Sequence, residues 1–202
     1  MENTKLTLGL LAAAIHVVAY FIYNLQARSG KSKPKASSWS IWTLLAGLNA
    51  LTYNDATNDV YATFQFFAGS VACFLTFLYL LVTHRFGWPG KKELKIFAIC
   101  IAAIVVWQVF HSASWANLIV LLALVVSFKP TLDAVLADPD VETPLSWVLW
   151  TTAFSITIAN KSIGWDGAII GFIMPSIAML VHGSVAVLSR KARKLRFKKE
   201  TS

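Results

Sequence analysis

Two short stretches, SSWSIWT at residues 37–43 and SWVLWT at residues 146–151, share the pattern Ser-Trp-x-x-Trp-Thr. Ser146 follows Ser38 by 108 residues, and the matched Trp and Thr residues keep the same offset. Each stretch begins an apolar segment. The repetition therefore reflects either the abundance of Trp at membrane edges or an internal duplication. A duplication would relate other segments of the chain by the same offset.

The composition is that of an integral membrane protein with an all-α fold. Of the 202 residues, 56% are hydrophobic and only 14% are charged, whereas a soluble domain carries roughly 25% charged residues. A single span over residues 96–128 would exceed the about 20 residues that cross a bilayer, so we expect a break at 111–114. The predicted membrane helices are then seven: Leu6–Leu25, Ser38–Tyr53, Val60–Thr83, Ile96–Phe110, Ser112–Phe128, Leu145–Asn160 and Gly167–Leu188.

The net charge of +8 is read as a topology signal, which argues against a nucleic-acid partner. Lys and Arg cluster after predicted helices one, three and seven, and the positive-inside rule places such clusters in the cytoplasm. We therefore expect a cell-membrane protein with its N-terminus outside and its C-terminus cytoplasmic. The last cluster either rests on anionic membrane lipid or is a solvated tail. The clusters are Arg28, Lys31, Lys33 and Lys35; Arg85, Lys91, Lys92 and Lys95; and Arg190, Lys191, Arg193, Lys194, Arg196, Lys198 and Lys199.

Two other charged features follow from this topology. Lys5 and Lys161 are the basic residues expected on the outer side. The cytoplasmic loop after Lys129 is acidic and either pairs with the basic loop between helices one and two or remains solvated, because exposed pairs contribute about 0–1 kcal/mol. Its acidic residues are Asp133, Asp138, Asp140 and Glu142.

The 108-residue offset relates predicted helix two to helix six and helix three to helix seven, and leaves helix four without a counterpart. Equivalent helices are four apart, so both halves insert in the same orientation. Such parallel repeats place a solute site near the midplane between them. The predicted organisation is a first triple-helix bundle (1–88), a linker helix (89–111), a second triple-helix bundle (112–190) and a basic cytoplasmic tail (191–202).

In this 3+1+3 plan the chain resembles the PQ-loop and SWEET-type transporter superfamily. Pro130 stands where that family has its Pro-Gln pair, although Thr131 follows it, and Lys31-Ser32 with Ser37-Ser38 is similar to the loop before the family's second helix. The resemblance implies alternating access between two halves. The sugar-transporting members carry Asn in helices three and seven, where this chain has Gln65 and the neighbourhood of Phe172-Ile173.

A second resemblance is to the nicotinamide riboside transporters, which have a Trp-x-x-Trp motif in a membrane helix. Trp39-Ser-Ile-Trp42 and Trp147-Val-Leu-Trp150 are similar to it, as is Tyr61-Ala62 followed by Gln65-Phe66-Phe67. The chain also resembles uncharacterised prokaryotic seven-helix membrane proteins with a proline before a Ser-Trp-x-x-Trp helix start, here Pro34 and Pro144.

The Trp residues are the first candidates for binding a solute. Residues at i and i+3 share a helix face, so each pair offers two rings for stacking on a flat molecule. The alternative for Trp39 and Trp147 is an aromatic belt at the membrane interface. Trp42 and Trp150 lie one turn deeper, and we take these two as candidate binding residues.

Polar side chains inside predicted spans are the next candidates, since they normally face the bundle interior. Each is either a solute contact or an interhelical hydrogen bond worth about 0.6–2 kcal/mol, and His16 could also relay protons. Asn160 is either an entrance residue or a helix cap. The substrate-binding candidates are thus His16, Trp42, Asn49, Gln65, Trp150 and Asn160, with His182 as a further intramembrane polar residue.

Proline residues mark candidate hinges. Pro175 lies inside predicted helix seven and Pro130 at the end of helix five. Proline removes a backbone hydrogen bond and kinks a helix, which serves either a rocking motion or fixed packing.

The pattern as a whole predicts a transporter of a small uncharged solute, sugar, nucleoside or vitamin-like, that works by alternating access. The alternative is a receptor or sorting protein of the same fold without transport activity. No Asp or Glu lies in a predicted span, and the two cysteines lack metal-ligand spacing. We therefore expect no enzyme activity, no metal and no cofactor, and leave open whether the chain forms a homo-oligomer.

Overall fold

The computed structural model describes residues 1–32, 34, 36–83, 90–165 and 167–200, and of residues 36, 37, 92, 93, 139 and 191–200 it describes the backbone alone. This part of the chain is all-helical and forms seven α-helices, as the sequence predicts. A short 3-10 helix, η1 (Pro139–Val141), precedes α6. The predictions for Lys33, Lys35 and Arg85 fall outside the described residues. The helices are α1 (Glu2–Arg28), α2 (Ala36–Thr57), α3 (Val60–Val82), α4 (Lys91–Phe110), α5 (Ala113–Ala137), α6 (Pro144–Ser162) and α7 (Ile170–Glu200).

Most helix boundaries lie close to the predicted ones, and the main differences are extensions. The break near His111 is present, because this residue has a φ of 49°, a left-handed backbone that a helix interior does not adopt. The loop predicted to begin at Lys129 is wrong, since α5 continues through Pro130 to Ala137. An ion pair between Lys129 and Asp133, with N and O 2.8 Å apart, supports the helix across the proline.

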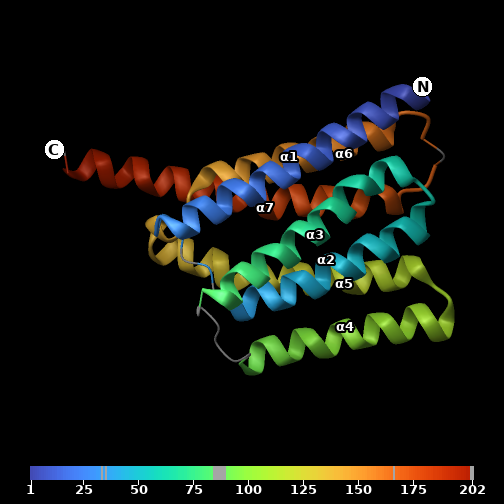
Figure 1. The fold of residues 1–202 in the computed structure, drawn as a ribbon, viewed down its shortest axis with the longest axis horizontal. Helices are drawn as coiled ribbons and strands as arrows, with labels where there is room; N and C mark the ends of the chain where they lie inside the picture. The colour runs from blue at the N-terminus through green and yellow to red at the C-terminus, as the bar shows by residue number, and fades with distance from the viewer. Residues whose placement is uncertain (33, 35, 84–89, 166, 201–202) are drawn as a thin grey trace.

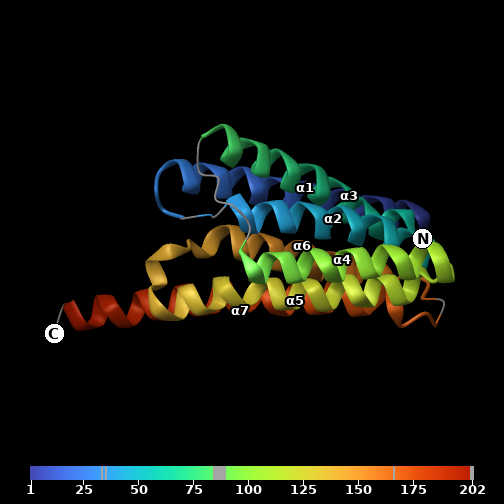
Figure 2. The same cartoon turned by 90° about the horizontal axis from the view of Figure 1, so that it is seen from below.

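The helices run alternately up and down, so their ends gather at two ends of an elongated bundle (Figure 1). We call the end where α1 begins the N-terminal end and the end where α7 finishes the C-terminal end. The last turns of α7 extend beyond the other helices (Figures 1 and 2). Helix therefore continues into the segment predicted as a basic tail.

The helices pack in a regular order. In the first part of the chain α3 packs against both α1 and α2, and in the last part α7 packs against both α5 and α6. The two parts meet where α1 packs on α6 and α2 packs on α5. Helix α4 packs on α5 and α2 and lies at the edge of the bundle (Figure 1).

Four helices in the described residues are long and apolar enough to cross a membrane: α1, α3, α5 and the Ile170–Arg190 part of α7. Many large apolar side chains face outward, which a soluble protein would rarely tolerate in such number. The structure thus indicates a membrane protein. Among these exposed side chains are Leu10, Val17 and Phe21 of α1, Val71, Phe74 and Leu75 of α3, Leu122 and Val126 of α5, and Leu180 and Val187 of α7.

The polar residues of α2 and α6 explain why these two helices are less apolar. Asn49 and Thr52 in α2 are buried, as are Thr157 and Asn160 in α6. Both helices lie where the two parts of the chain meet, so their polar groups bond across the interior.

Candidate functional site

A cavity of about 80 Å³ lies between the two parts of the bundle, within reach of six helices. A water molecule needs about 10–15 Å³ of such volume, so this cavity holds a few waters or a very small solute. Both Trp pairs reach it. Its lining residues are His16, Tyr20, Trp39, Trp42, Leu45, Ala46, Asn49, Phe66, Gly69, Ser70, Cys73, Val120, Leu121, Leu124, Phe128, Trp147, Trp150, Phe154, Met174 and His182.

Trp39 and Trp147 are interior residues. They are only 2% and 1% exposed, so the interpretation as a lipid-facing aromatic belt is wrong for both. The burial follows from helix packing: Trp39 lies in α2 and Trp147 in α6, the helices at the meeting surface. The repeated sequence pattern thus places four indole rings around one cavity.

Two tyrosine rings of α1 connect the Trp pairs. The ring of Tyr20 lies 5.9 Å from Trp39 and 5.0 Å from Trp150, measured between ring centroids. Tyr23, one turn further along α1, lies 5.2 Å from Trp39 and 6.3 Å from Trp147. These separations are typical of aromatic pairs, so the rings form one continuous wall across both parts of the chain.

His16 is held at the cavity by a chain of hydrogen bonds. Its Nδ1 lies 2.8 Å from Nε2 of Gln65, whose side-chain oxygen accepts from the Thr157 hydroxyl. This chain runs from α1 through α3 to α6. A Cβ at Gly69 would lie 2.7 Å from Nε2 of His16, so glycine at this position is required for the histidine ring to fit.

A second polar chain involves Asn49. Its Oδ1 accepts a hydrogen bond of 3.0 Å from Nδ2 of Asn117 in α5, which also lies 3.0 Å from the Thr52 hydroxyl. Trp42 adds a third link between the same helices, because its Nε1 donates to the Ser127 hydroxyl at 3.0 Å. Both candidates from α2 are thereby fixed against α5.

Trp150 of α6 and His182 of α7 add further polar groups to the cavity lining. In the part of the chain that the structure describes, the buried Nε1 of Trp150 has no hydrogen-bond partner. Nδ1 of His182 lies 2.7 Å from the Ala178 carbonyl of its own helix. A buried indole N–H normally finds an acceptor, so Trp150 is a donor that a solute or water in the cavity would satisfy.

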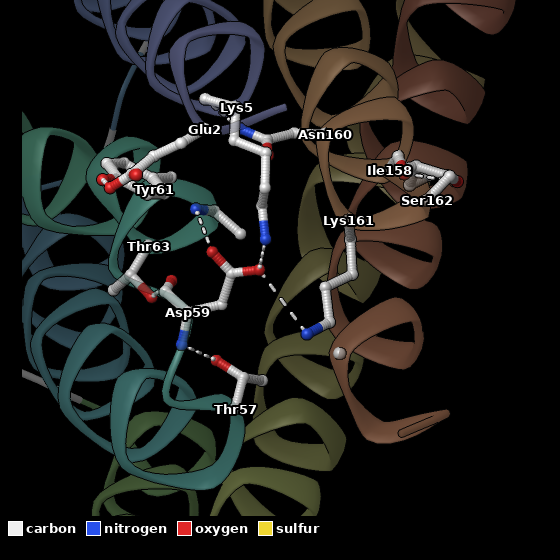
Figure 3. A network of polar contacts seen from close by, with 12 residues as sticks. Glu2, Lys5, Thr57, Asp59, Tyr61, Thr63, Ile158, Asn160, Lys161 and Ser162 are labelled. Atoms are coloured by element: carbon white, nitrogen blue, oxygen red, sulfur yellow. Dashed lines mark hydrogen bonds and ion pairs between the residues drawn. The ribbon is translucent and has the colours of Figure 1, made fainter. Parts of the chain in front are cut away.

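An ion-pair cluster around Asp59 lies at the N-terminal end (Figure 3). Oδ2 of Asp59 lies 2.6 Å from Nζ of Lys5 and 3.5 Å from Nζ of Lys161. Its Oδ1 accepts from the Ala62 backbone N–H and so caps α3. Burial alone would raise the pKa of Asp59, but the hydrogen bonds from Lys5 and Ala62 and the two lysine charges outweigh burial and lower it.

Asn160 belongs to this cluster and does not line the cavity. Its Nδ2 donates to the Lys5 carbonyl at 2.8 Å (Figure 3), which joins α6 to α1. The stem of Lys161 passes over Gly171 of α7, where a Cβ would lie 2.4 Å from Cε of the lysine. The cluster therefore connects the two parts of the chain through α1, the start of α3, α6 and α7.

The C-terminal end contains a vestibule of about 270 Å³. Trp39 and Trp42 line both this vestibule and the central cavity, so their indoles stand between the two spaces. The vestibule residues are Tyr23, Pro34, Ser38, Trp39, Trp42, Pro130, Thr131, Ala134, Val141 and Glu142.

Glu142 is buried at the vestibule, 7% exposed, and not in a solvated acidic loop. Oε1 accepts from the Tyr23 hydroxyl at 3.0 Å, and Oε2 accepts from Nε1 of Trp147 at 3.1 Å. Burial raises the pKa of Glu142 to about 7 against the lowering effect of these hydrogen bonds. Nearby, Thr143 donates to the Lys31 carbonyl and Ser146 to Gln26, so the loop before α6 docks on the end of α1.

The two proline residues differ in their surroundings. Pro130 lies inside α5 at the vestibule. Pro175 lies inside α7 and has no N–H to donate to the carbonyl of Gly171, four residues earlier. The Tyr53 hydroxyl of α2 donates to that carbonyl at 2.7 Å. The proline thus creates an acceptor that joins the two parts of the chain.

The structure places four of the six predicted binding residues at the cavity: His16, Trp42, Asn49 and Trp150. Gln65 lies behind the wall, bonded to His16. Among the described residues no group of three or more His, Cys, Asp or Glu side chains is arranged to hold a metal ion.

Sequence reasoning did not select Asp59, Glu142, Tyr20, Tyr23 or Asn117. Asp59 and Glu142 lie just outside the apolar runs, where acidic residues are ordinarily solvated. Their positions directly before α3 and α6 were the available signal, since acidic residues favour helix N-termini.

Comparison with known proteins adds no relative: no protein-family model, curated protein or solved structure matches this chain. The family resemblance therefore depends on the sequence motifs and the helix order.

Proposed function

We propose that this protein is a membrane carrier of a small, largely uncharged solute, which binds in the central cavity and crosses by alternating access. The observation that carries the proposal is the convergence of both Trp pairs on one cavity between the two parts of the bundle. None of the described lining residues is Asp, Glu, Lys or Arg. Charged solutes would be costly there, whereas rings and neutral hydrogen-bonding groups suit a sugar, nucleoside or vitamin-like molecule.

The proposal includes a duplicated architecture of the PQ-loop and SWEET type. Helices α1–α3 and α5–α7 would be parallel repeats with α4 as the linker, the N-terminal end outside and the C-terminal end cytoplasmic. Three observations support this plan. The two Ser-Trp-x-x-Trp-Thr motifs are 108 residues apart, and the third helix of each triplet packs against both of the others. Residues that are 108 positions apart also line the same cavity. The equivalent lining pairs are His16 with Leu124, Tyr20 with Phe128, Trp39 with Trp147, Trp42 with Trp150, Ala46 with Phe154, and Phe66 with Met174.

The two ends suggest how access would alternate. The Asp59 cluster joins the two parts at the N-terminal end, while the vestibule approaches the cavity from the C-terminal end. The described conformation is then one in which a solute would approach from the cytoplasm, past Trp39 and Trp42. Breaking the Asp59 cluster would open the outer path, and the present small cavity would enlarge in either open state.

Uptake by purified protein in liposomes tests the proposal. The screen covers sugars, nucleosides, vitamins and amino acids, and we expect at least one neutral solute to enter faster than in protein-free liposomes. Trp42→Ala and Trp150→Ala should lower that uptake at least tenfold.

The matched control is Trp115→Ala in α5, because this indole is 66% exposed on the outer surface. It should leave uptake within twofold. No uptake of any solute would contradict the carrier and favour the receptor or sorting protein. Equal loss with Trp115→Ala would contradict the central cavity as the binding site.

A further inference from the structure

Polar groups from three different helices come together at the central cavity. The ring of His16 in α1 lies 6.4 Å from that of Trp150 in α6, and the Trp150 ring lies 5.7 Å from that of His182 in α7, measured between ring centroids. The two histidine rings also share a neighbour, Phe154, at 5.3 and 5.1 Å. All of these residues line the cavity, so a single small molecule inside it is within reach of each polar group.

The hydrogen bonds behind His16 determine which of its ring nitrogens carries the proton. The side-chain oxygen of Gln65 accepts from the Thr157 hydroxyl, so the Gln65 amide presents its NH2 group to His16. Nε2 of Gln65 lies 2.8 Å from Nδ1 of His16. Because an amide NH2 group only donates, Nδ1 is the acceptor and carries no proton. The proton of this neutral ring is therefore on Nε2.

Nε2 of His16 lies beside a glycine of the cavity lining. It is 2.7 Å from the point that a Cβ at Gly69 would occupy, and Gly69 lines the cavity. The missing side chain of glycine leaves this space open. His16 thus presents an N–H donor at the cavity wall.

His182 has the opposite tautomer. Its Nδ1 lies 2.7 Å from the Ala178 carbonyl oxygen, and because a carbonyl only accepts, Nδ1 carries a proton. None of the described lining residues is Asp or Glu, so the cavity lining favours the neutral ring over the charged one. Nε2 of His182 is then a hydrogen-bond acceptor.

Trp150 supplies a second donor. Its side chain is 3% exposed, and its buried Nε1 has no hydrogen-bond partner in the described part of the chain. Leaving a buried N–H without an acceptor is unfavourable, and a bound molecule would remove this cost. The cavity therefore presents a fixed pattern of two donors, on His16 and Trp150, and one acceptor, on His182.

We propose that this pattern recognises a small neutral amide, the group that carboxamides, lactams and ureas share. The carbonyl oxygen of an amide has two lone pairs, which accept from Trp150 and His16, and the amide N–H donates to Nε2 of His182. The group is planar and uncharged, which suits aromatic walls without a charged side chain among the described lining residues. That the amide is the transported solute rests on the proposed function, whereas its binding does not.

Two features favour an amide over a single hydroxyl group. An amide spreads its acceptor and its donor over two atoms, whereas a hydroxyl would have to bring nitrogens from three helices to about 2.9 Å from one oxygen. The cavity volume of about 80 Å³ is also several times the about 10–15 Å³ that one water needs. The space therefore suits a molecule of a few non-hydrogen atoms.

NMR of the full chain in detergent, with labelled imidazole nitrogens, tests the pattern without any solute. Protonated and unprotonated ring nitrogens have well-separated chemical shifts. At neutral pH we expect the proton of His16 on Nε2 and that of His182 on Nδ1, with the signals assigned by their loss in His16→Gln and His182→Phe. Any other placement of these protons, or a doubly protonated ring, would overturn the proposal.

Titration with acetamide tests recognition, with acetone, acetate and isopropanol as probes of nearly the same shape. Acetone lacks the N–H, acetate is charged, and isopropanol carries a hydroxyl. Because such small probes bind weakly, the titrations extend to about 100 mM. The readout is the indole N–H signal of Trp150, assigned by Trp150→Phe. Acetamide should move this signal saturably and bind about tenfold more tightly than each other probe.

The matched control is the indole signal of Trp115, which is 66% exposed on the outer surface and should show no saturable change. His182→Phe keeps a ring but removes the acceptor, so the preference for acetamide over acetone should fall to within about twofold. If this variant does not fold, the comparison of the probes in the parent protein still decides.

Equal binding of acetamide and acetone by the parent, isopropanol binding as tight as acetamide, or an unchanged preference in His182→Phe would overturn the proposal. Uptake of another solute without any preference for acetamide would refute the amide and leave the carrier. Preferential binding of acetamide without uptake of any solute would refute the carrier and retain the amide site.

Discussion

At each end of the bundle a buried carboxylate joins the two parts of the chain, but the surroundings of the two carboxylates differ. Asp59 meets two lysine ammonium groups and a backbone N–H. Glu142 accepts hydrogen bonds from a phenol and an indole among its contacts, and burial has the largest effect on its pKa. The same structural task therefore produces opposite pKa shifts, downward at Asp59 and upward at Glu142. Lowering the pH should therefore reduce the contribution of Asp59 to stability at the N-terminal end. It should increase the contribution of Glu142 at the C-terminal end.

The largest effect is expected from removing the charge at the N-terminal end. Asp59→Ala leaves the ammonium groups of Lys5 and Lys161 close together without their carboxylate and removes the cap of α3. Breaking a buried pair costs about 3–5 kcal/mol. We expect the free energy of unfolding in detergent to fall by about that amount, measured by thermal or denaturant unfolding.

The matched control is Asp133→Ala, because the Lys129–Asp133 pair is exposed on both sides and contributes about 0–1 kcal/mol. The triple replacement Lys5→Met, Asp59→Ala and Lys161→Met should recover part of the loss, since no charge is left buried. Equal losses for Asp59→Ala and Asp133→Ala would contradict a buried cluster.

An effect of intermediate size is expected at the C-terminal end, where removing the carboxylate charge should stabilise the protein. Since burial raises the pKa of Glu142 to about 7 from 4.5, the folded state binds more protons than the unfolded state between these values. Its contribution to stability thus falls as pH rises from about 4.5 to 7 and is constant above 7. Glu142→Gln, neutral throughout, should gain about 1–3 kcal/mol relative to the parent between pH 5 and 8.

Unfolding curves of both proteins at several pH values measure this difference. A difference independent of pH would show that Glu142 is ionised throughout. For Asp59 the sign reverses, because its lowered pKa gives stability that is present above the ordinary carboxyl pKa and lost as pH falls through the lowered value.

A smaller effect is expected between the ends, where Tyr53 donates to the carbonyl that Pro175 leaves free. Tyr53→Phe should cost about 1–2 kcal/mol, because Gly171 then has an unpaired buried carbonyl. In a Pro175→Ala background, the restored backbone N–H supplies a partner, so the same replacement should cost clearly less. A double-mutant cycle measures this coupling, and additive losses would exclude it.

Much of the fold was predictable from the sequence because apolar runs and basic clusters are set by the bilayer itself. The seven helices and the break at His111 follow from span length. The extension of α5 past Pro130 was not predictable, since a proline near the end of an apolar run ordinarily ends a helix.

The candidate site was predictable only for residues inside the apolar runs. His16, Trp42, Asn49 and Trp150 were selected because polar and aromatic side chains within a span usually face the interior, and they do line the cavity. Glu142 was not selected, because its burial depends on the docking of a loop onto α1, a long-range contact that its position before α6 does not reveal.

Solute uptake by cross-linked protein tests the central claim. This claim is that the two parts of the chain separate first at one end of the bundle and then at the other. Proteins without the native cysteines would carry Lys5→Cys with Lys161→Cys at the N-terminal end, together with Asp59→Asn so that no carboxylate is left buried without its lysine partners. At the C-terminal end they would carry Gln26→Cys with Ser146→Cys. A reducible cross-link in either pair should abolish uptake, and reduction should restore it.

A cross-link within one part is the control: Thr43→Cys with native Cys73, whose present atoms lie 3.6 Å apart between α2 and α3, placed in a Cys100→Ser background. This control cross-link should not prevent the exchange between the two open conformations, even if it changes solute binding directly. The pH-dependent fluorescence of the cavity Trp residues measures that exchange. Undiminished uptake with either end cross-linked would contradict the account.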